Sequence, residues 1–305
     1  MAGLKILSHR YDRTVTKEQL LDPDARTART DLDGPLNYLL VGSDRRPGDS
    51  GPDQRSDTIL IVHVPAGQRE AYLVSIPRDL LVAIPPANGF GGGQDKINAA
   101  YEHGGGGQAG AQLLSATLNR LTGIRFDGAA LIDFSGFRKV IDLLGGVEMC
   151  VDTEVRSIHT KRVFPIGCQQ MDGAQALDYV RQRYDLPGGD YDRQHHQQQL
   201  LRAMLDSAGK ADLRTNPVKL DQVLRAVGGS LTVDTNGVPL EDLLLALRAL
   251  PPDGMRGVQV PSSPQTIDEV SYVVLDNGGN GLFEALRGTR VPAWAQANPR
   301  WVTRL

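Results

Sequence analysis

Several features are scarce in this sequence, and each scarcity excludes a class of protein. No apolar run approaches the roughly 18 residues that a membrane-spanning helix needs, and no signal-peptide pattern follows Met1. The net charge is only -3 at pH 7, whereas general nucleic-acid binders carry a marked basic excess, so no nucleic-acid partner is expected. The glycine-rich tract at 89–107 lacks the lysine–serine ending of a nucleotide-binding loop, so we expect flexible surface around a short helix there.

Cysteine is scarce as well. The chain has two, Cys150 and Cys168, which lie 18 positions apart. No His–Cys spacing near them suits zinc. The residues alone leave two interpretations open: a disulfide that closes the intervening loop in an oxidising compartment, or two unrelated buried thiols.

Strand and helix patterns alternate along most of the chain. With 305 residues and 40% hydrophobic content, the chain can bury a large core. Because no linker or change of composition interrupts the alternation, we expect a single α/β domain over residues 35–290, with a mixed central β-sheet flanked by helices. Residues 1–34 are expected to form a polar lead-in, and residues 291–305 a C-terminal tail. The periodicity predicts strands at 36–41, 55–64, 71–76, 80–84, 129–132, 147–151, 231–233, 258–260 and 270–275, and helices at 113–121, 134–144, 190–208, 218–227, 240–250 and 282–286.

Three arginines surround one glycine-containing loop. An extended backbone points Arg181 and Arg183 to the same side, because the side chains of a strand alternate. Arg193 and Gln197 lie one turn apart on one face at the start of the helix expected at 190–208. The chain thus offers several hydrogen-bond donors around a single loop.

These donors suit an anion with more than one charge. A helix N-terminus presents unpaired N–H groups, and guanidinium groups match phosphate oxygens two at a time. Asp190 or Asp192 is the expected cap of the helix. In the alternative interpretation, the arginines only form ion pairs on a solvated loop with Asp178, Asp185, Asp190 and Asp192.

Carboxylates follow two neighbouring strands. Asp44 comes after the first expected strand, and Asp57 lies in the second, where Arg55 shares its face. Arg78 follows the third strand. Ligands of open α/β sheets usually bind where strands end, and one or two carboxylates with substrate phosphates suit Mg²⁺. Simple ion pairing between these aspartates and neighbouring arginines is the alternative.

Six blocks of the sequence resemble the LytR-CpsA-Psr family, and they occur in that family's order across roughly residues 36–290. The blocks are NYLLVGSDRR, RSDTILIV, LVSIPRDL, KINAAY, IDFSGFRKVIDLLGGVEMCV and GAQALDYVRQRY with GGDYDRQHHQQQ. The resemblance implies a phosphotransferase that moves a glycopolymer from a polyprenyl-pyrophosphate carrier to the peptidoglycan of the cell wall and releases polyprenyl phosphate. It also implies an extracytoplasmic location and an N-terminal membrane anchor that is absent from this chain.

The resemblance assigns roles to particular residues. It implies Mg²⁺ held by Asp44 and Asp57, and apolar helices at 113–121 and 134–144 around the polyprenyl tail. The pyrophosphate would be surrounded by Arg55, Arg78, Arg181, Arg183, Arg193 and Gln197. The residues implied in catalysis are Arg55, Asp57, Arg78 and Arg183.

Two further expectations depend on the family. The implied extracytoplasmic location favours the disulfide between Cys150 and Cys168. His196 stands where many members carry a second arginine, and a neutral histidine there would weaken the anion site.

Two other functions remain open. A hydrolase would use water as the acceptor and only cleave the pyrophosphate, and a non-catalytic protein would bind the lipid pyrophosphate without reaction. A pair of metal-binding carboxylates beside the arginines favours catalysis over simple binding.

Overall fold

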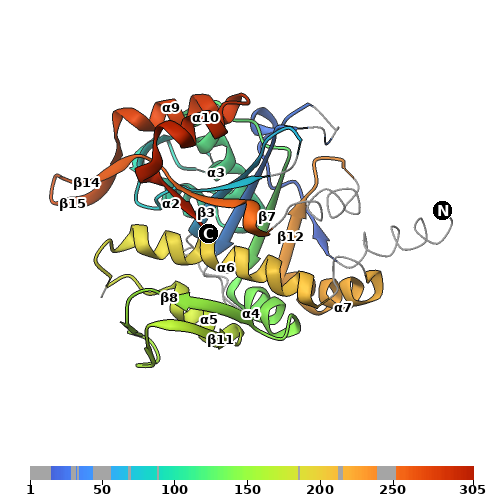
Figure 1. The fold of residues 1–305 in the computed structure, drawn as a ribbon. Coiled ribbons are helices and arrows are strands. Elements are labelled where there is room, and N and C mark those ends of the chain that lie inside the picture. Colours follow the sequence, from blue (N-terminus) through green and yellow to red (C-terminus); the bar gives the residue numbers. More distant parts are fainter. Residues whose placement is uncertain are drawn as a thin grey trace.

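The computed structural model describes residues 15–28, 32, 34–43, 56–67, 70–87, 89–184, 186–211, 216–238 and 252–305. An eight-stranded mixed sheet forms the centre of the molecule (Figure 1). In spatial order its strands are β1 (Thr16–Lys17), β12 (Leu231–Asp234), β7 (Gly128–Asp133), β2 (Leu36–Ser43), β3 (Ser56–Val64), β4 (Ala71–Ser75), β13 (Met255–Gln259) and β16 (Val302–Arg304).

Helices cover both faces of this sheet (Figure 1). One face carries α2 (Ile97–His103), α3 (Gly107–Thr122), α9 (Asn277–Arg287) and α10 (Val291–Ala297). The other face carries α4 (Phe134–Leu143), α5 (Gly173–Val180), α6 (Asp190–Lys210) and α7 (Pro217–Val227). In the described part of the chain, four antiparallel strand pairs lie outside the sheet: β5 (Leu81–Ile84) with β6 (Gly93–Lys96), β8 (Val147–Val151) with β11 (Gly167–Met171), β9 (Val155–Arg156) with β10 (Val163–Phe164), and β14 (Ser262–Ile267) with β15 (Val270–Leu275).

The alternation of side chains along β2 and β3 divides the core into two layers. Leu39 and Ile61 are paired across the strands and fully buried in the core that includes α3. The neighbouring pair, Leu40 and Leu60, points to the opposite face, where Leu201 of α6 packs against it. The two-residue period of these strands therefore determines which side chains face α6.

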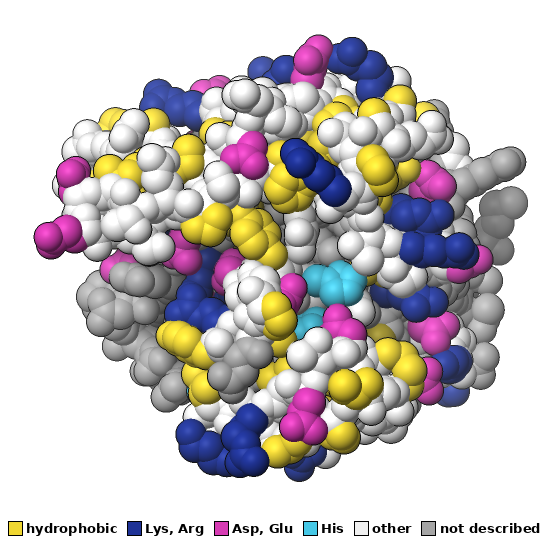
Figure 2. All heavy atoms as spheres, turned by 60° about the vertical axis from the view of Figure 1, so that its left-hand side comes forward, with side chains coloured by type: hydrophobic (Ala, Val, Ile, Leu, Met, Phe, Trp, Pro, Cys, Tyr) yellow, Lys and Arg dark blue, Asp and Glu magenta, His cyan; other side chains and the backbone are white. Residues whose placement is uncertain are grey.

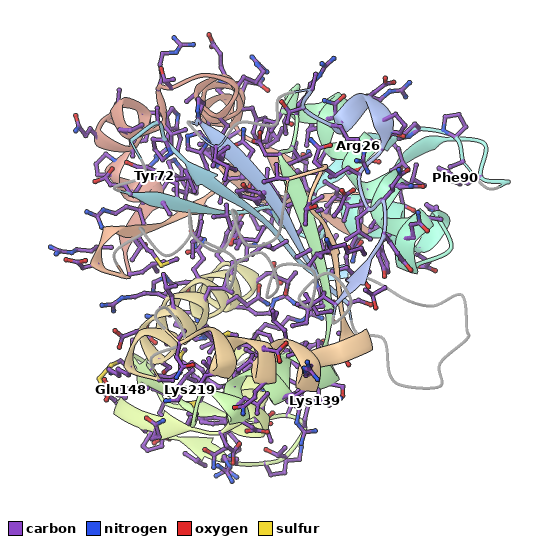
Figure 3. The ribbon with its side chains drawn as sticks, turned by 90° about the vertical axis from the view of Figure 1, so that its right-hand side faces the viewer. Arg26, Tyr72, Phe90, Lys139, Glu148 and Lys219 are labelled. Atoms are coloured by element: carbon purple, nitrogen blue, oxygen red, sulfur yellow. A yellow bond between two sulfur atoms is a disulfide. The ribbon has the colours of Figure 1, made fainter. Side chains whose placement is uncertain are left out.

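A smaller lobe lies beyond α6. Figure 3 shows Lys139 of α4, Glu148 of β8 and Lys219 of α7 in this lobe, well separated from Tyr72 in the central sheet. The lobe has its own apolar core, built from β8, β11, α4 and α5 and closed by Leu200 of α6.

The two cysteines of the chain lie in the smaller lobe. Cys150 and Cys168 are directly opposite each other in the paired strands β8 and β11. The structure thus brings the two sulfur atoms together.

Both flanking segments contribute to the domain more than their polar sequences indicate. Leu20 and Leu21 of the lead-in are buried in the main core, and Arg26 forms an ion pair of 2.5 Å with Asp234 of β12. In the expected C-terminal tail, β16 pairs with β13 and becomes an edge strand of the central sheet. Three-residue strands carry too little periodicity to be recognised from sequence.

The predicted fold class, an α/β domain with a mixed sheet between helices, is confirmed. The helix expected at 240–250 lies outside the described residues. One local prediction was wrong, because Gly189 and not an aspartate is the N-cap of α6, and Asp192 instead accepts a hydrogen bond from the Gly188 N–H. Within the described part of the chain, none of the helices combines the length and hydrophobicity needed to cross a bilayer.

Candidate functional site

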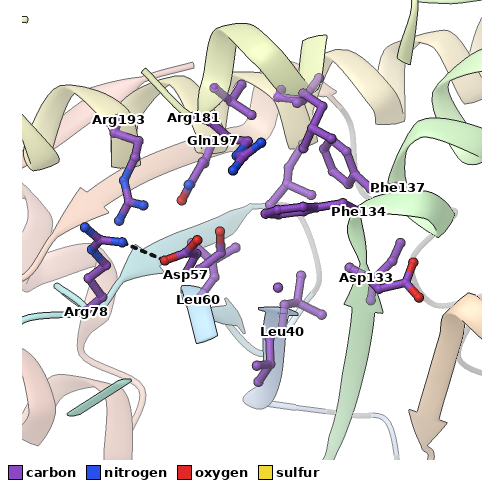
Figure 4. A pocket seen from close by; sticks show the side chains of 18 of the residues that line it. Leu40, Asp57, Leu60, Arg78, Asp133, Phe134, Phe137, Arg181, Arg193 and Gln197 are labelled. Carbon is purple, nitrogen blue, oxygen red and sulfur yellow. Dashed lines mark hydrogen bonds and ion pairs between the residues drawn. The ribbon is translucent and has the colours of Figure 1, made fainter. Parts of the chain in front are cut away.

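A pocket of about 420 Å³ lies between the central sheet and helices α4, α5 and α6 (Figure 4). Its sheet wall includes Leu40 and Leu60, the residues that β2 and β3 turn toward α6. Arg78, Arg193 and Asp57 lie at one end and the rings of Phe134 and Phe137 at the other, as Figure 4 shows. The pocket is therefore amphipathic.

At the polar end, an aspartate on either side holds the arginines in place. Arg78 follows β4, and its Nη1 donates to Asp57 Oδ1 at 2.6 Å. Arg193, in the first turn of α6, forms an ion pair of 2.8 Å with Asp190. Asp190 Oδ1 also lies 3.8 Å from Arg78 Nε, so a single carboxylate lies between the two guanidinium groups.

Arg193 is the most deeply buried of these arginines. It is 5% exposed, and its Nε has no hydrogen-bond partner among the described residues. Burial lowers the pKa of Arg193, and repulsion from Arg78 and Arg183 lowers it further, whereas Asp190 and Asp57 raise it. An arginine remains protonated even so, and a buried unpaired donor beside like charges favours an added anion.

Arg78 has the opposite shift. Burial lowers its pKa, but attraction from Asp57, Asp190 and Asp79 raises it, and the net pKa lies above the ordinary value. The carboxylates therefore keep this guanidinium charged in a partly buried place.

The other two arginines lie against aromatic rings. The Arg181 guanidinium lies 4.5 Å from the centre of the Phe134 ring, and that of Arg183 lies 4.8 Å from the Tyr184 ring, whose hydroxyl it reaches at 3.0 Å. Stacking on a ring leaves the edge of a guanidinium free to bind an anion. Both arginines line the pocket, but the extended backbone expected at Arg181 was wrong, because Arg181 is the C-cap of α5 and has a helical backbone.

The structure brings together most of the residues singled out in the sequence. Asp57, Arg78, Arg181, Arg183, Arg193 and Gln197 all line the one pocket. Asp44 and Arg55 lie outside the described residues.

The apolar end was predicted only in part. Phe134 and Phe137 of α4 line it as expected, together with Leu177, Val180, Leu200, Leu201 and Met204 of α5 and α6. The prediction for 113–121 was wrong, because Leu114 and Leu118 of α3 are fully buried on the other face of the sheet. Helical periodicity shows which side of a helix is apolar but not which sheet face it covers.

His196 does not belong to the pocket lining. It is 1% exposed, stacks on Tyr179 at 4.5 Å between ring centres, and its Nε2 lies 3.5 Å from Asp152. Burial lowers the pKa of His196, with a partial offset from Asp152. The side chain of His196 therefore packs between α5 and α6, outside the pocket lining.

Two features of the site were missed in the sequence, since His159 and Tyr184 form part of the pocket wall. The ion pairing of Asp190 with the arginines, named in the sequence as the alternative interpretation, is present. His159 is near the pocket only because the chain folds back, and no local pattern indicates that.

Among the described residues, no group of three or more His, Cys, Asp or Glu side chains is placed to hold a metal ion. Asp57 nevertheless suits Mg²⁺, because its carboxylate lines the pocket beside the arginines and Mg²⁺ needs only one or two carboxylates when substrate phosphates and water supply the other ligands. Asp133 is a poor candidate, since its Oδ1 caps α4 at Gly136 N and its carboxylate points away from the arginines in Figure 4.

Comparisons with known proteins agree with this architecture. The chain is 34% identical over 267 residues to the probable cell wall biosynthesis protein LcpB of Corynebacterium glutamicum, covering 82% of this chain and 61% of that protein. It is 30% identical over 217 residues to the polyisoprenyl-teichoic acid–peptidoglycan teichoic acid transferase TagU of Enterococcus faecalis, covering 70% of this chain and 66% of that protein. The chain thus spans less than two thirds of the length of either relative.

A solved structure shows the same fold. The LytR-Csp2A-Psr enzyme from Actinomyces oris superposes with a TM-score of 0.64 at 22% identity, covering 95% of this chain and 99% of that one. The model of the LytR_cpsA_psr family matches residues 5–282. Since this match covers most of the chain, the protein belongs to the LytR_cpsA_psr family.

Proposed function

We propose that this protein is a phosphotransferase that moves a glycopolymer from a polyprenyl-pyrophosphate carrier to peptidoglycan. The observation that carries the proposal is the amphipathic pocket, in which four arginines lie next to an apolar compartment between α4, α5 and α6. A pyrophosphate joined to a hydrocarbon chain likewise has a charged end and an apolar end. The names of the relatives in C. glutamicum and E. faecalis support cell-wall chemistry and transfer to peptidoglycan.

In this reaction a hydroxyl of the acceptor attacks the phosphorus nearest the glycan. A new P–O bond forms, the hydroxyl proton is lost, and the P–O bond to polyprenyl phosphate breaks. Such a transfer asks a protein mainly for positioning and charge neutralisation. Arg78 and Arg193, held by Asp57 and Asp190, would bind the phosphates from one side, and Arg183 with Arg181 from the other.

We also propose Mg²⁺ as the cofactor, with Asp57 as a ligand and Asp44 as its partner. A bound Mg²⁺ would neutralise charge on the phosphate oxygens. Gln197, one turn from Arg193 on α6, would donate a neutral hydrogen bond to the same group. We further propose that Arg55 binds the pyrophosphate together with these residues.

The proposed place of action is the outer side of the cell membrane, with the chain attached by an N-terminal anchor. The proximity of Cys150 and Cys168 supports an oxidising compartment, in which we propose that they are bonded. Cytosolic proteins rarely contain a disulfide bond, because their thiols are kept reduced.

Product analysis tests the function. The protein would be incubated with a polyprenyl-pyrophosphate-linked sugar, a peptidoglycan fragment and Mg²⁺, and the products identified by mass spectrometry. Transfer yields equal amounts of polyprenyl phosphate and glycosyl-phosphate-modified acceptor. Free sugar phosphate and polyprenyl phosphate with an unmodified acceptor would identify a hydrolase, and an unchanged carrier that stays bound would identify a binding protein.

The same experiment tests the metal proposal when the rate is measured at several Mg²⁺ concentrations. Asp57→Ala should lose most of the dependence of the rate on Mg²⁺ while still binding the carrier through the arginines. Equal Mg²⁺ dependence in wild type and Asp57→Ala would remove Asp57 from the metal site.

A further inference from the structure

A short hairpin forms part of the rim of the pocket. β9 and β10 pair from Val155 to Phe164, and the turn between them is closed by a hydrogen bond from Ser157 N to Arg162 O at 2.8 Å. We call residues 155–166 the rim hairpin. Two of its residues, Ile158 and His159, line the pocket.

Buried hydrogen bonds fix this hairpin to the end of α5. Ser157 Oγ donates to Asp178 Oδ1 at 2.6 Å, and Gln182 Oε1 accepts from Ile158 N at 3.0 Å. Ser157, Asp178 and Gln182 are all buried. The tip is therefore held rigidly next to Tyr184, which follows α5 and lines the same pocket.

Exposed apolar side chains are concentrated on this rim. Among the described residues, only six large hydrophobic side chains are exposed, and four of them lie in the rim hairpin or beside it: Ile158 (40%), Val163 (39%), Ile166 (70%) and Tyr184 (67%). Scattered exposed hydrophobics need no explanation, but four in one hairpin and the segment bonded to it, two of which (Ile158 and Tyr184) line an apolar pocket, indicate a contact surface.

The same segment is basic. Arg156, Lys161 and Arg162 are exposed, and no acidic residue occurs from position 155 to position 171. In Figure 2, dark blue and yellow side chains lie close together in the lower part of the molecule, where the smaller lobe is. The rim thus combines aliphatic and aromatic side chains with positive charge.

We propose that the rim hairpin and Tyr184 dock on the surface of an anionic phospholipid bilayer, so that the mouth of the pocket faces the membrane. The basic side chains would contact lipid phosphates, and the apolar ones would enter the headgroup boundary, where tyrosine is favoured. A glycan partner fits less well, because Ile166 and Val163 offer neither hydrogen bonds nor a flat ring.

The biological meaning of this surface rests on the proposed function, since a polyprenyl tail must pass from a bilayer into the pocket without crossing water. Docking of the rim hairpin gives the tail an apolar path past Ile158 and Tyr184. The physical claim, that this surface binds anionic membranes, is independent of any transfer activity.

Sedimentation with vesicles tests the proposal. The chain would be mixed with vesicles of phosphatidylcholine alone or with a third of phosphatidylglycerol, at low salt. Binding should require phosphatidylglycerol and weaken with added salt. Each basic residue near such a surface is worth about a fivefold change in partition, so the double charge reversal Arg156→Glu with Arg162→Glu should lower binding roughly 25-fold or more.

Matched variants separate the surface from general effects. Ile166→Asp should also lose binding, whereas Val270→Asp, at another exposed apolar residue on the other lobe (43% exposed, against 70% for Ile166), should not. Reversal of two exposed arginines on and after α3, Arg120→Glu with Arg125→Glu, controls for net charge. Retained circular dichroism and melting temperature would exclude misfolding.

Two results would overturn the inference: equal binding of wild type and the rim variants, or equal losses in the rim and control variants. Activity on a detergent-dispersed carrier with a short tail is measured in parallel. The Ile166→Asp protein should keep the wild-type rate there, because no bilayer is involved. Absence of activity in every protein would count against the proposed function and leave the vesicle result to decide the docking surface.

Discussion

At the scale of the residue, the pocket depends on guanidinium geometry as well as charge. Arg183 stacks on Tyr184 and lines the pocket, which leaves its donors able to bind two phosphate oxygens together. Arg183→Lys keeps the charge but removes this two-point contact. Since hydrogen bonds to charged groups are worth about 1.5–3 kcal/mol, we expect kcat/KM to fall roughly 10- to 100-fold.

Transfer kinetics at equal protein stability would measure this effect, with Arg120→Lys on the far face of the sheet as the control. An Arg183→Lys protein as active as wild type would show that charge alone suffices at this position.

A second residue-scale prediction concerns pH. His63 is fully buried, its Nδ1 contacts Asn37 Oδ1 at 2.8 Å, and burial lowers the pKa of His63 to about 4. The unfolded chain takes up this proton near pH 6.5, so the stabilising effect is complete above that pH and is lost as the pH falls toward 4. A shift of this size corresponds to about 3 kcal/mol of unfolding free energy.

Urea denaturation of wild type and His63→Gln from pH 7 to pH 4 would measure how much His63 contributes to the pH dependence of the unfolding free energy. The wild type should lose about 3 kcal/mol more than the variant over this range. Parallel curves for the two proteins would assign the acid sensitivity to other groups.

Among the secondary-structure elements, the strand pair β8 and β11 allows a test of the stabilisation expected from a disulfide. A bond between Cys150 and Cys168 closes a loop with a sequence separation of 18. In the chain-entropy model, a loop of this length contributes roughly 3 kcal/mol to stability. Reduction should therefore lower the midpoint of denaturation, and a Cys150→Ser, Cys168→Ser protein should not respond to reductant. Two free thiols in the denatured, unreduced protein would contradict the bond.

Helices α4, α5 and α6 are predicted to form the tail compartment. Met204→Trp would fill part of its apolar end and should weaken binding of long-chain carriers more than that of short-chain ones. Ala109→Trp on the exposed surface of α3 is the control. The measurement is binding affinity against tail length, and an unchanged length preference in Met204→Trp would place the tail elsewhere.

The same helices illustrate which parts of the structure can be predicted from the sequence. Strands such as β2 and β4 and helices such as α4 follow from apolar periodicity, because burial imposes that period locally. The place of α3 does not follow, since its apolar side would fit either face of the sheet. The contact of Asp190 with Arg78, and the rim hairpin beside Tyr184, depend on distant segments that no local pattern records.

At the scale of the whole molecule, the central claim is that one pocket takes both halves of the carrier. The sheet face formed by Leu40 and Leu60 is one wall, and the smaller lobe with α6 is the other. The arginines come from segments after β4, after α5 and at the start of α6, and only the assembled fold brings them together. A second cavity, near Glu70, Tyr72 and Arg256, offers an alternative place for a ligand.

A crystal structure of the protein with a polyprenyl pyrophosphate and Mg²⁺ would locate both halves of the carrier. We expect the pyrophosphate within hydrogen-bond distance of Arg78, Arg183 and Arg193, and the hydrocarbon between α4, α5 and α6. A pyrophosphate bound beside Arg256, or a tail lying against α3, would contradict it.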